Sequence, residues 1–277
     1  MNKEIRVSII LPMYKDIVAL ELILNALKEQ TYLNFEVVVA EDDDTEETKS
    51  FLEQYQSDFL IKHLFQEDHG NRKATAVNKA LNICEGEYII FIDGDTIPFK
   101  TFIESHVQLS DKDTVLCGRR VNLGEKVSND LRKKIKTSSD LENHYFKNYF
   151  YLNNDNLRHY EQGLRFSPNS LIHNIISKQD KNIHIVGSNF SCFKKNIFLI
   201  NGFDEDIIGG SKDDVDLEWR FIMSGCHLKS AKFCANLFHL DHARNSRTDD
   251  EKIARQQMER NKDNKQYICP NGIKKSE

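Results

Sequence analysis

Residues 88–96 read YIIFIDGDT, an apolar run that ends abruptly in two carboxylates. Such a short apolar run beside a turn signal is typical of a strand that is buried on both faces of a sheet. In open α/β sheets ligands bind at the carboxyl ends of the strands, so Asp93, Gly94 and Asp95 are expected at a ligand-binding edge. Carboxylate oxygens are preferred ligands of Mg²⁺ and Mn²⁺. An ordinary solvated Asp-Gly turn could have the same sequence. Because Asp93 and Asp95 come directly after a buried strand, a site for a metal and a substrate is favoured.

The segments around this strand alternate between strand and helix. Apolar strands are expected at 7–11, 35–40 and 59–65, and helices at 17–30, 46–56 and 74–84. A later strand is expected at 184–186, leading into 190–194. Strands that alternate with helices form a parallel sheet covered on both faces. The sequence therefore predicts a Rossmann-like α/β fold with a mixed, mainly parallel sheet flanked by helices.

Composition excludes several classes of protein. The chain of 277 residues has a net charge of −5, whereas a nucleic-acid-binding protein needs a basic surface. No apolar run approaches the roughly 20 residues of a membrane span, and the polar start at 1–6 does not resemble a signal peptide. Six cysteines without a CxxC pair suit free thiols in a reducing compartment. We therefore expect a cytoplasmic protein that binds no nucleic acid.

A second predicted strand also ends in acids. The run VVVA at 37–40 is followed by Glu41, Asp42, Asp43 and Asp44, whose mutual repulsion costs stability unless a cation or a hydrogen-bond donor uses them. Asp43 and Asp44 could simply cap the next helix. Glu41 and Asp42 leave the strand directly and are the stronger candidates for ligand binding.

Two more polar clusters lie in the second half of the chain. Asp213 and Asp214 follow residues 209–212, GGSK, and open a predicted helix. The helix macrodipole favours acids there, so capping alone would explain them; a carboxylate can also be the general base that deprotonates an attacking hydroxyl group. His239 and His242 follow an apolar stretch, and two imidazoles at this spacing can converge on one metal with Asp95.

Together these motifs resemble the family-2 glycosyltransferases of the GT-A fold. The strand SIILPMY at 8–14, the acidic strand end within 36–48, and the stretch from EDHGNR at 67–72 to the acidic turn occur in that family's order. GSN at 187–189, GFDE at 202–205, the acids at 213–214 and HLDH at 239–242 resemble the C-terminal half of chondroitin polymerases and β1,4-galactosyltransferases. The resemblance covers most of residues 5–243. It implies a metal-dependent, inverting transfer of a hexose or N-acetylhexosamine from a UDP-sugar to a glycan or lipid-linked acceptor in polysaccharide biosynthesis.

The resemblance also implies roles for the donor-binding residues. Pro12 and Tyr14 would line the base pocket, and Glu41 or Asp42 would contact the uracil. The other nucleotide-sugar contacts would be Asp68, Arg72, Asn78, Gly94 and Asp93, the last facing the ribose or the metal. The chain departs from the family's pattern at four places: Glu41, Asp43-Asp44, Val77 and Asp213. Since Val77 stands where the family usually has arginine, Arg72 would take that role.

For the chemistry, the resemblance implies Mn²⁺ or Mg²⁺ bound by Asp95, His239 and His242. Asp214 would be the catalytic base, and Asp213 would bind the acceptor. Two alternatives remain open. Residues 91–96 also fit the DxDxT signature of haloacid-dehalogenase-type phosphohydrolases, although that motif normally ends a domain's first strand. A nucleotide-sugar-binding subunit without catalytic activity would share the fold, but the intact acids and both histidines argue against it.

We expect one catalytic domain at 1–248, with a nucleotide-binding half at 1–100, a helical insertion at 123–181 and an acceptor-binding, catalytic half at 182–245. The insertion carries the basic cluster Arg132-Lys133-Lys134 and five aromatic residues between 145 and 151. Such a segment can rest on an anionic membrane, here the inner face, or pack onto the catalytic domain or a second subunit of a homo-oligomer. Either way we expect it to serve acceptor binding or assembly. The polar tail at 249–277 is predicted to be an exposed helix with a frayed end.

Overall fold

The computed structural model describes residues 4–153, 155–207, 213–242 and 248–275. Its centre is a seven-stranded sheet in the order β3-β2-β1-β4-β8-β6-β9. The strands are β1 Val7–Met13, β2 Phe35–Glu41, β3 Leu60–Leu64, β4 Tyr88–Ile92, β6 Thr114–Cys117, β8 Asn189–Phe193 and β9 His227–Ser230. β1 to β4 pair in parallel, and β8 runs antiparallel to both its neighbours, β4 and β6. The predicted mixed, mainly parallel sheet is confirmed.

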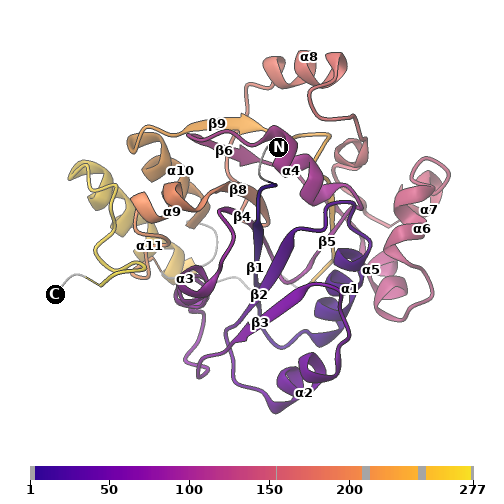
Figure 1. The fold of residues 1–277 in the computed structure, drawn as a ribbon, viewed down its shortest axis with the longest axis horizontal. Coiled ribbons are helices and arrows are strands. Elements are labelled where there is room, and N and C mark those ends of the chain that lie inside the picture. The colour runs from indigo at the N-terminus through magenta and orange to yellow at the C-terminus, as the bar shows by residue number, and fades with distance from the viewer. Residues whose placement is uncertain (1–3, 154, 208–212, 243–247, 276–277) are drawn as a thin grey trace.

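Helices cover both faces of this sheet. Ile9 and Val37 face one core, which also contains residues of α1 Ile17–Lys28, α4 Phe102–Leu109 and α5 Glu125–Arg132. Ile10 and Val38 face the other core, with α3 Lys73–Ile83, α9 Lys194–Leu199 and α10 Asp213–Met223. Figure 1 shows α3 and α10 on one side of the sheet and α1 on the other. Because successive side chains of a strand point to opposite faces, burial of both faces explains the uninterrupted apolar runs.

A second, three-stranded sheet joins distant parts of the chain beside the acidic turn. It consists of β5 Thr96–Pro98, β7 Val121–Asn122 and β10 Leu237–His239, in the order β5-β10-β7. β5 begins directly after Asp95, and its Thr96 is paired with His239 of β10. The backbone N–H of Leu240 also donates to the carbonyl oxygen of Asp95 at 2.9 Å. The small sheet thus brings the histidine motif to the DxD turn.

Two expected strand boundaries are wrong. No strand forms at 184–186, where the backbone N–H of Ile185 donates to Glu218 Oε2 at 2.9 Å instead of to the sheet. β1 continues through Pro12 to Met13. Its pairing with β4 stops at Ile10, so beyond that point β1 is paired only with β2 and tolerates the missing N–H of proline.

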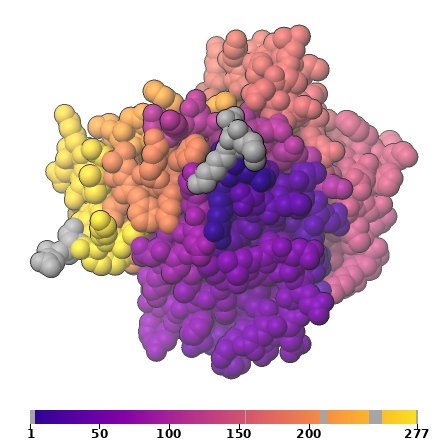
Figure 2. Space-filling model, in the orientation of Figure 1, coloured from indigo at the N-terminus to yellow at the C-terminus, as the bar shows by residue number. Residues whose placement is uncertain are grey.

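The insertion is helical, as expected. It contains α5, α6 Ser138–Asn143, α7 Tyr149–Asn153, a 3₁₀ helix Tyr160–Gly163 and α8 Leu171–Gln179. These residues form the pink and salmon surface at the right and upper edges of Figure 2. None of the described helices is long and apolar enough to span a membrane.

The C-terminal segment is packed against the domain over its described residues, 248–275. Helix α2, Glu46–Gln54, lies between β2 and β3 in the chain. The last helix, α11 Thr248–Asp263, buries Ala254 and Met258 against Ile207. The Asn201 side chain then donates from Nδ2 to the carbonyl oxygens of Cys269 and Lys274, at 2.7 and 2.8 Å. The prediction of a loose end is wrong because a few apolar residues and these polar contacts hold a largely charged segment.

A fully buried polar network lies between α4 and β8. Tyr88 Oη and Ser191 Oγ are 2.6 Å apart, and Ser191 Oγ is 2.7 Å from His106 Nδ1. Asn189 donates from Nδ2 to the carbonyl oxygens of Arg119 and Ala235, which turns its Oδ1 towards His106 Nε2 at 3.1 Å. His106 therefore carries its proton on Nε2 and is neutral.

This neutral histidine predicts a loss of stability in acid. Burial lowers the pKa of His106 to about 3, although the hydrogen bond to Asn189 opposes the shift. The unfolded chain takes up this proton near pH 6.5, so between about pH 6.5 and 3 the unfolded state binds more protons and the folded state loses stability as the pH falls. By pH 5 we expect His106 to lower the free energy of unfolding by about 2 kcal/mol.

Urea unfolding of the parent and of His106→Gln at pH 7.5 and 5 measures this contribution. The variant should show the weaker dependence on pH, whatever its stability at pH 7.5. Equal dependence in the two proteins would exclude His106 as the cause.

Candidate active site

Asp95, His239 and His242 converge on one point beside the small sheet. Asp95 Oδ2 lies 3.4 Å from His239 Nε2 and 3.2 Å from His242 Nε2. One ligand atom from each of the three side chains can be chosen so that all lie within 4.8 Å of one another. The structure therefore brings together the three residues that were predicted to bind a metal.

The donor set fits a divalent transition metal. Among the described residues, Asp95 Oδ1 is buried without a hydrogen-bond partner, so a carboxylate oxygen remains open to an ion. Burial alone would raise the pKa of Asp95, but hydrogen bonds from the two imidazoles hold it below its ordinary value. The carboxylate is thus in the ionised form that a metal requires.

The turn that carries Asp95 is pressed against the end of β1. A Cβ atom at Gly94 would lie 2.7 Å from the carbonyl oxygen of Pro12, so no larger residue fits there without a shift of the backbone. Pro12 itself is buried. Gly94 and Pro12 therefore bring the acidic turn and the strand end together. This close approach gives both residues a structural role that does not depend on contact with a nucleotide.

Helix α10 begins with Asp213 and Asp214. Residues 209–212, which precede them, lie outside the described part of the chain. Burial raises the pKa of Asp213 to about 6, with Lys73 opposing the shift and Asp214 adding to it. Burial also raises the pKa of Asp214, against the effects of Lys73 and of a hydrogen bond from the backbone of Gly187. A carboxylate whose pKa is raised towards neutrality is well suited to accept a proton.

Lys73, which no sequence motif identified, links these acids to the turn. Its Nζ lies 2.5 Å from Asp93 Oδ1. Burial opposes the positive charge, but the electrostatic effects of Asp93, Asp213 and Asp214 raise the pKa of Lys73 above its ordinary value. Lys73 is the first residue of α3, where the helix macrodipole disfavours a cation. A basic residue at a helix start was the signal that could have identified it.

The predicted base pocket has an exposed end and a buried end. At the exposed end, Asp68 Oδ2 accepts from Tyr14 Oη at 3.0 Å and from Lys15 Nζ at 2.8 Å. Hydrogen bonds from Lys15, Gly70 and Tyr14 lower the pKa of Asp68 to about 2. Tyr14 is 52% exposed, so its ring and the ionised Asp68 are open to a ligand.

At the buried end, the strand-end acids are used inside the protein. Glu41 accepts from Thr45 Oγ1 at 2.9 Å and lies 2.8 Å from His63 Nε2. Asp42 accepts from Gln66 Nε2 and from the backbone N–H of Arg72, both at 2.7 Å. Asp42 thereby fixes the segment that carries Arg72. The cap of the next helix is Thr45, not Asp43 or Asp44.

Asn78 is buried and forms hydrogen bonds within the protein. It is 2% exposed, and its amide exchanges hydrogen bonds with the backbone of Phe203 and donates to Glu205 Oε1, each at 2.9 Å. Every polar atom of this side chain joins α3 to the segment before α10, so these bonds give Asn78 a structural role, and the expected nucleotide contact stays a prediction.

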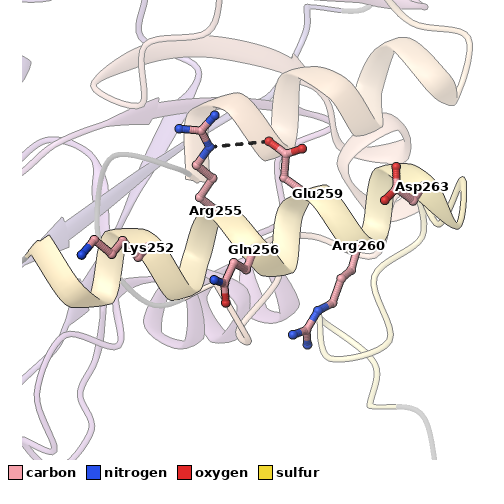
Figure 3. Close-up of a pocket in the computed structure, with 6 residues that line it drawn as sticks. All are labelled: Lys252, Arg255, Gln256, Glu259, Arg260 and Asp263. Carbon is pink, nitrogen blue, oxygen red and sulfur yellow. Dashed lines mark ion pairs between the residues drawn. The ribbon is translucent and has the colours of Figure 1, made fainter.

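One cavity in the described structure, of about 410 Å³, lies elsewhere. Its lining comes from α11 alone: Lys252, Arg255, Gln256, Glu259, Arg260 and Asp263. Figure 3 shows Arg255 and Glu259, which form an ion pair, pointing away from Arg260. None of the candidate site residues lines it. The site is therefore defined by its converging side chains and not by this groove.

The strand order bears on the phosphohydrolase alternative. Asp93 follows β4, and β1, β2 and β3 precede it in the same sheet. A phosphohydrolase signature ends the first strand of its domain, so the position of the motif does not match that class.

Comparison with known proteins agrees with the geometry. The family model "Glycosyl transferase family 2" matches residues 8–186. A chondroitin synthase of Escherichia coli is 22% identical over 249 residues, which cover 81% of this chain but only 33% of that protein. The chain thus spans about a third of this curated relative.

Solved structures share the fold. A mannosyltransferase from Pyrobaculum calidifontis in complex with GDP-Man and Mn²⁺ superposes with a TM-score of 0.57 at 18% identity, over 88% of this chain and 59% of that one. GalNAc-T7 with UDP, GalNAc and Mn²⁺ gives a TM-score of 0.59 at 11% identity, over 87% and 45%. The expected GT-A architecture is confirmed. With the family match over more than half of its length, the chain belongs to glycosyl transferase family 2.

Proposed function

We propose that this enzyme transfers a hexose or N-acetylhexosamine from a UDP-sugar to a hydroxyl group of a glycan or lipid-linked acceptor, with inversion at the anomeric carbon. The convergence of Asp95, His239 and His242 beside the acids of α10 carries this proposal. It supplies a metal site and a base within one edge of the sheet, where ligands bind in open α/β folds. The chondroitin synthase relative favours a role in polysaccharide biosynthesis.

The donor set favours Mn²⁺ over Mg²⁺. Mg²⁺ prefers oxygen ligands and keeps several waters, whereas two of the three ligands here are imidazole nitrogens, which suit transition metals. Both similar solved structures contain Mn²⁺. When bound, the ion would neutralise charge that develops on the leaving diphosphate.

Asp214 is the proposed base of a single displacement. The acceptor oxygen attacks the anomeric carbon, its proton passes to a carboxylate oxygen of Asp214, and the bond from that carbon to the diphosphate oxygen breaks to release UDP. The backbone of Gly187 holds the carboxylate in place, and the raised pKa makes it a competent base near neutral pH. Asp213, beside it, would bind the acceptor. One displacement with one base inverts the anomeric centre.

Thermal unfolding with a panel of nucleotide sugars tests the donor assignment. A ligand that binds only the folded state raises the apparent melting temperature. UDP-galactose, UDP-N-acetylgalactosamine or UDP-glucose should stabilise the enzyme when Mn²⁺ is present, and GDP-mannose should do so less. Stabilisation by GDP-mannose alone would overturn the choice of uracil.

Fewer residues of the insertion could contact a membrane than its sequence suggests. Arg132 and Lys134 form ion pairs with Asp16 and Glu21 at 2.8 Å each, so two of the three basic residues are engaged with the catalytic domain. Phe146 and Phe150 are 72% and 76% exposed. We therefore propose that these two rings, more than the basic cluster, carry any peripheral membrane contact.

Replacement of Phe146 and Phe150 with Ser should weaken sedimentation with anionic liposomes by roughly 10-fold or more, because two exposed rings lose apolar contact with the bilayer. The matched control is Lys133→Ser, which removes the third member of the basic cluster, also exposed. If both proteins bind liposomes like the parent, the insertion does not dock on membranes.

A further inference from the structure

The small sheet places an arginine of the insertion in line with the metal cluster. Thr96 of β5 is paired with His239 of β10, and His239 is paired with Asn122 of β7. Asn122 in turn forms an isolated antiparallel bridge with Arg158. Side chains that are paired across neighbouring strands lie on the same face of a sheet. Arg158 therefore shares the face on which His239 contacts Asp95.

The residues on the opposite face agree with this register. Ile97, Phe238 and Val121 belong to the first hydrophobic core, and Leu157, next to Arg158, packs against it. Strand side chains alternate between faces, so Arg158 points away from that core, and it is exposed. With neighbouring strands about 4.8 Å apart, the backbone of Arg158 lies about 10 Å from that of His239.

The backbone holds Arg158 in this position. Asn122 N donates to the carbonyl oxygen of Arg158 at 3.0 Å, and Arg158 N donates to that of Asn122 at 3.1 Å. Asn156 and His159, on either side, have φ angles of 54° and 62°. Left-handed conformations cost free energy in residues other than glycine and often occur at functional sites. The chain is thus bent on both sides of one residue that pairs with the sheet.

Within the described part of the chain, no other residue uses the guanidinium of Arg158. Across the described ranges of the chain it has neither an ion pair nor a side-chain hydrogen bond. The paired residues Thr96, His239, Asn122 and Arg158 form a row across the small sheet. A second arginine, Arg120, links this row to the proposed base. Arg120 donates from Nη1 to Ser188 Oγ at 3.1 Å and acts electrostatically on Asp214. Two arginines therefore lie beside β7, one paired with Asn122 and the other acting on the proposed base.

We propose that Arg158, with Arg120, forms a subsite for an acidic group of the acceptor, a sugar carboxylate or a phosphate. This inference rests on the proposed function. A guanidinium binds both kinds of oxyanion in a bidentate manner. The row runs from β5, which follows the DxD turn, through β10 to β7 and then Arg158, so it leads away from the nucleotide-binding strands. The donor diphosphate lies at the start of this row and the acceptor at its end.

Calorimetric titration with UDP and Mn²⁺ present measures the subsite without turnover. The probes are methyl β-D-glucuronide against methyl β-D-glucoside for the carboxylate, and N-acetylglucosamine 1-phosphate against N-acetylglucosamine for the phosphate. The parent should bind at least one acidic probe more tightly than its neutral counterpart. Arg158→Met should reduce that preference by roughly 10- to 150-fold, the usual range for a lost hydrogen bond to a charged group.

Two further variants make the result specific. Arg158→Lys retains the charge but not the bidentate fork and should recover only part of the preference, whereas Lys147→Met, which removes an exposed cation elsewhere in the insertion, should keep all of it. Circular dichroism confirms that each variant folds. The subsite is refuted if the parent binds acidic and neutral probes equally, or if Arg158→Met weakens UDP binding instead of the preference. Absence of UDP binding in the parent would instead refute the proposed function.

Discussion

Asp214→Asn is expected to lower kcat by roughly 10²–10⁴-fold, the usual contribution of a general base, while UDP-sugar affinity changes little. The amide has nearly the shape of the carboxylate and can still accept the backbone hydrogen bond from Gly187, but it cannot take the acceptor's proton. Steady-state kinetics with saturating acceptor, together with calorimetric donor binding, separates the two effects.

Asp213→Asn is the matched control, because Asp213 precedes the base on the same helix turn. Its main effect should be on the KM of the acceptor. A large loss of donor binding in Asp214→Asn, with kcat nearly retained, would move the base elsewhere. The parent's kcat/KM should fall in acid, starting at a higher pH than for an ordinary carboxyl group, since burial raises the pKa of Asp214 and its protonation removes the base.

Asp95→Asn should lower activity by roughly 10³-fold or more and abolish the effect of Mn²⁺ on UDP binding. Loss of one electrostatic contact to developing charge already costs about 10²–10³ in rate, and this change removes the ionised ligand of the cluster. His239→Ala and His242→Ala should each weaken Mn²⁺ binding with a smaller loss of activity at saturating metal. Mn²⁺ titration monitored by electron paramagnetic resonance provides the direct readout.

Asp68→Asn is the control for this series. Its carboxylate contacts Tyr14 and Lys15 at the exposed end of the base pocket, so the change should affect UDP affinity and leave Mn²⁺ affinity in the absence of nucleotide as in the parent. If Asp95→Asn binds Mn²⁺ and turns over like the parent, the three residues are not the metal site.

The sequence predicts the central strands well because burial on both faces leaves a continuous apolar pattern. The run ending in Asp93 and Asp95 was placed correctly for this reason. The failure at 184–186 has the opposite cause. Ile185 is apolar and buried, yet its backbone N–H is bonded to Glu218 of α10, and no local pattern distinguishes such a contact from a strand.

Convergence of Asp95 with the two histidines depends on pairing between β5 and β10, which are far apart in the chain. The residue types and spacing suggested that the histidines could share a metal with Asp95, and the family resemblance supported this, but the pairing that joins them is not visible in the sequence. Lys73 and Arg158 were missed because their importance arises from tertiary contacts: one lies against Asp93, and the other enters the sheet through a single bridge.

Asn78 illustrates a different limit of a sequence motif. Its position in the motif is the same whether its amide contacts a ligand or another part of the protein, and the structure shows the second arrangement, with Phe203 and Glu205. Glu41 and Asp42 are similar, since strand-end acids in a parallel sheet can either bind ligands or fix the adjacent loops. Their hydrogen bonds to His63, Gln66 and Arg72 were not readable from composition or periodicity.

The proposed reaction is metal-dependent sugar transfer from a UDP-sugar at the cluster of Asp95, His239 and His242. Its most direct test is UDP release by the purified chain from the donor that stabilises it best, with Mn²⁺, with EDTA, and with EDTA followed by excess Mn²⁺. We expect UDP release with Mn²⁺, none with EDTA and recovery when the metal is restored. Undiminished release in EDTA would contradict it.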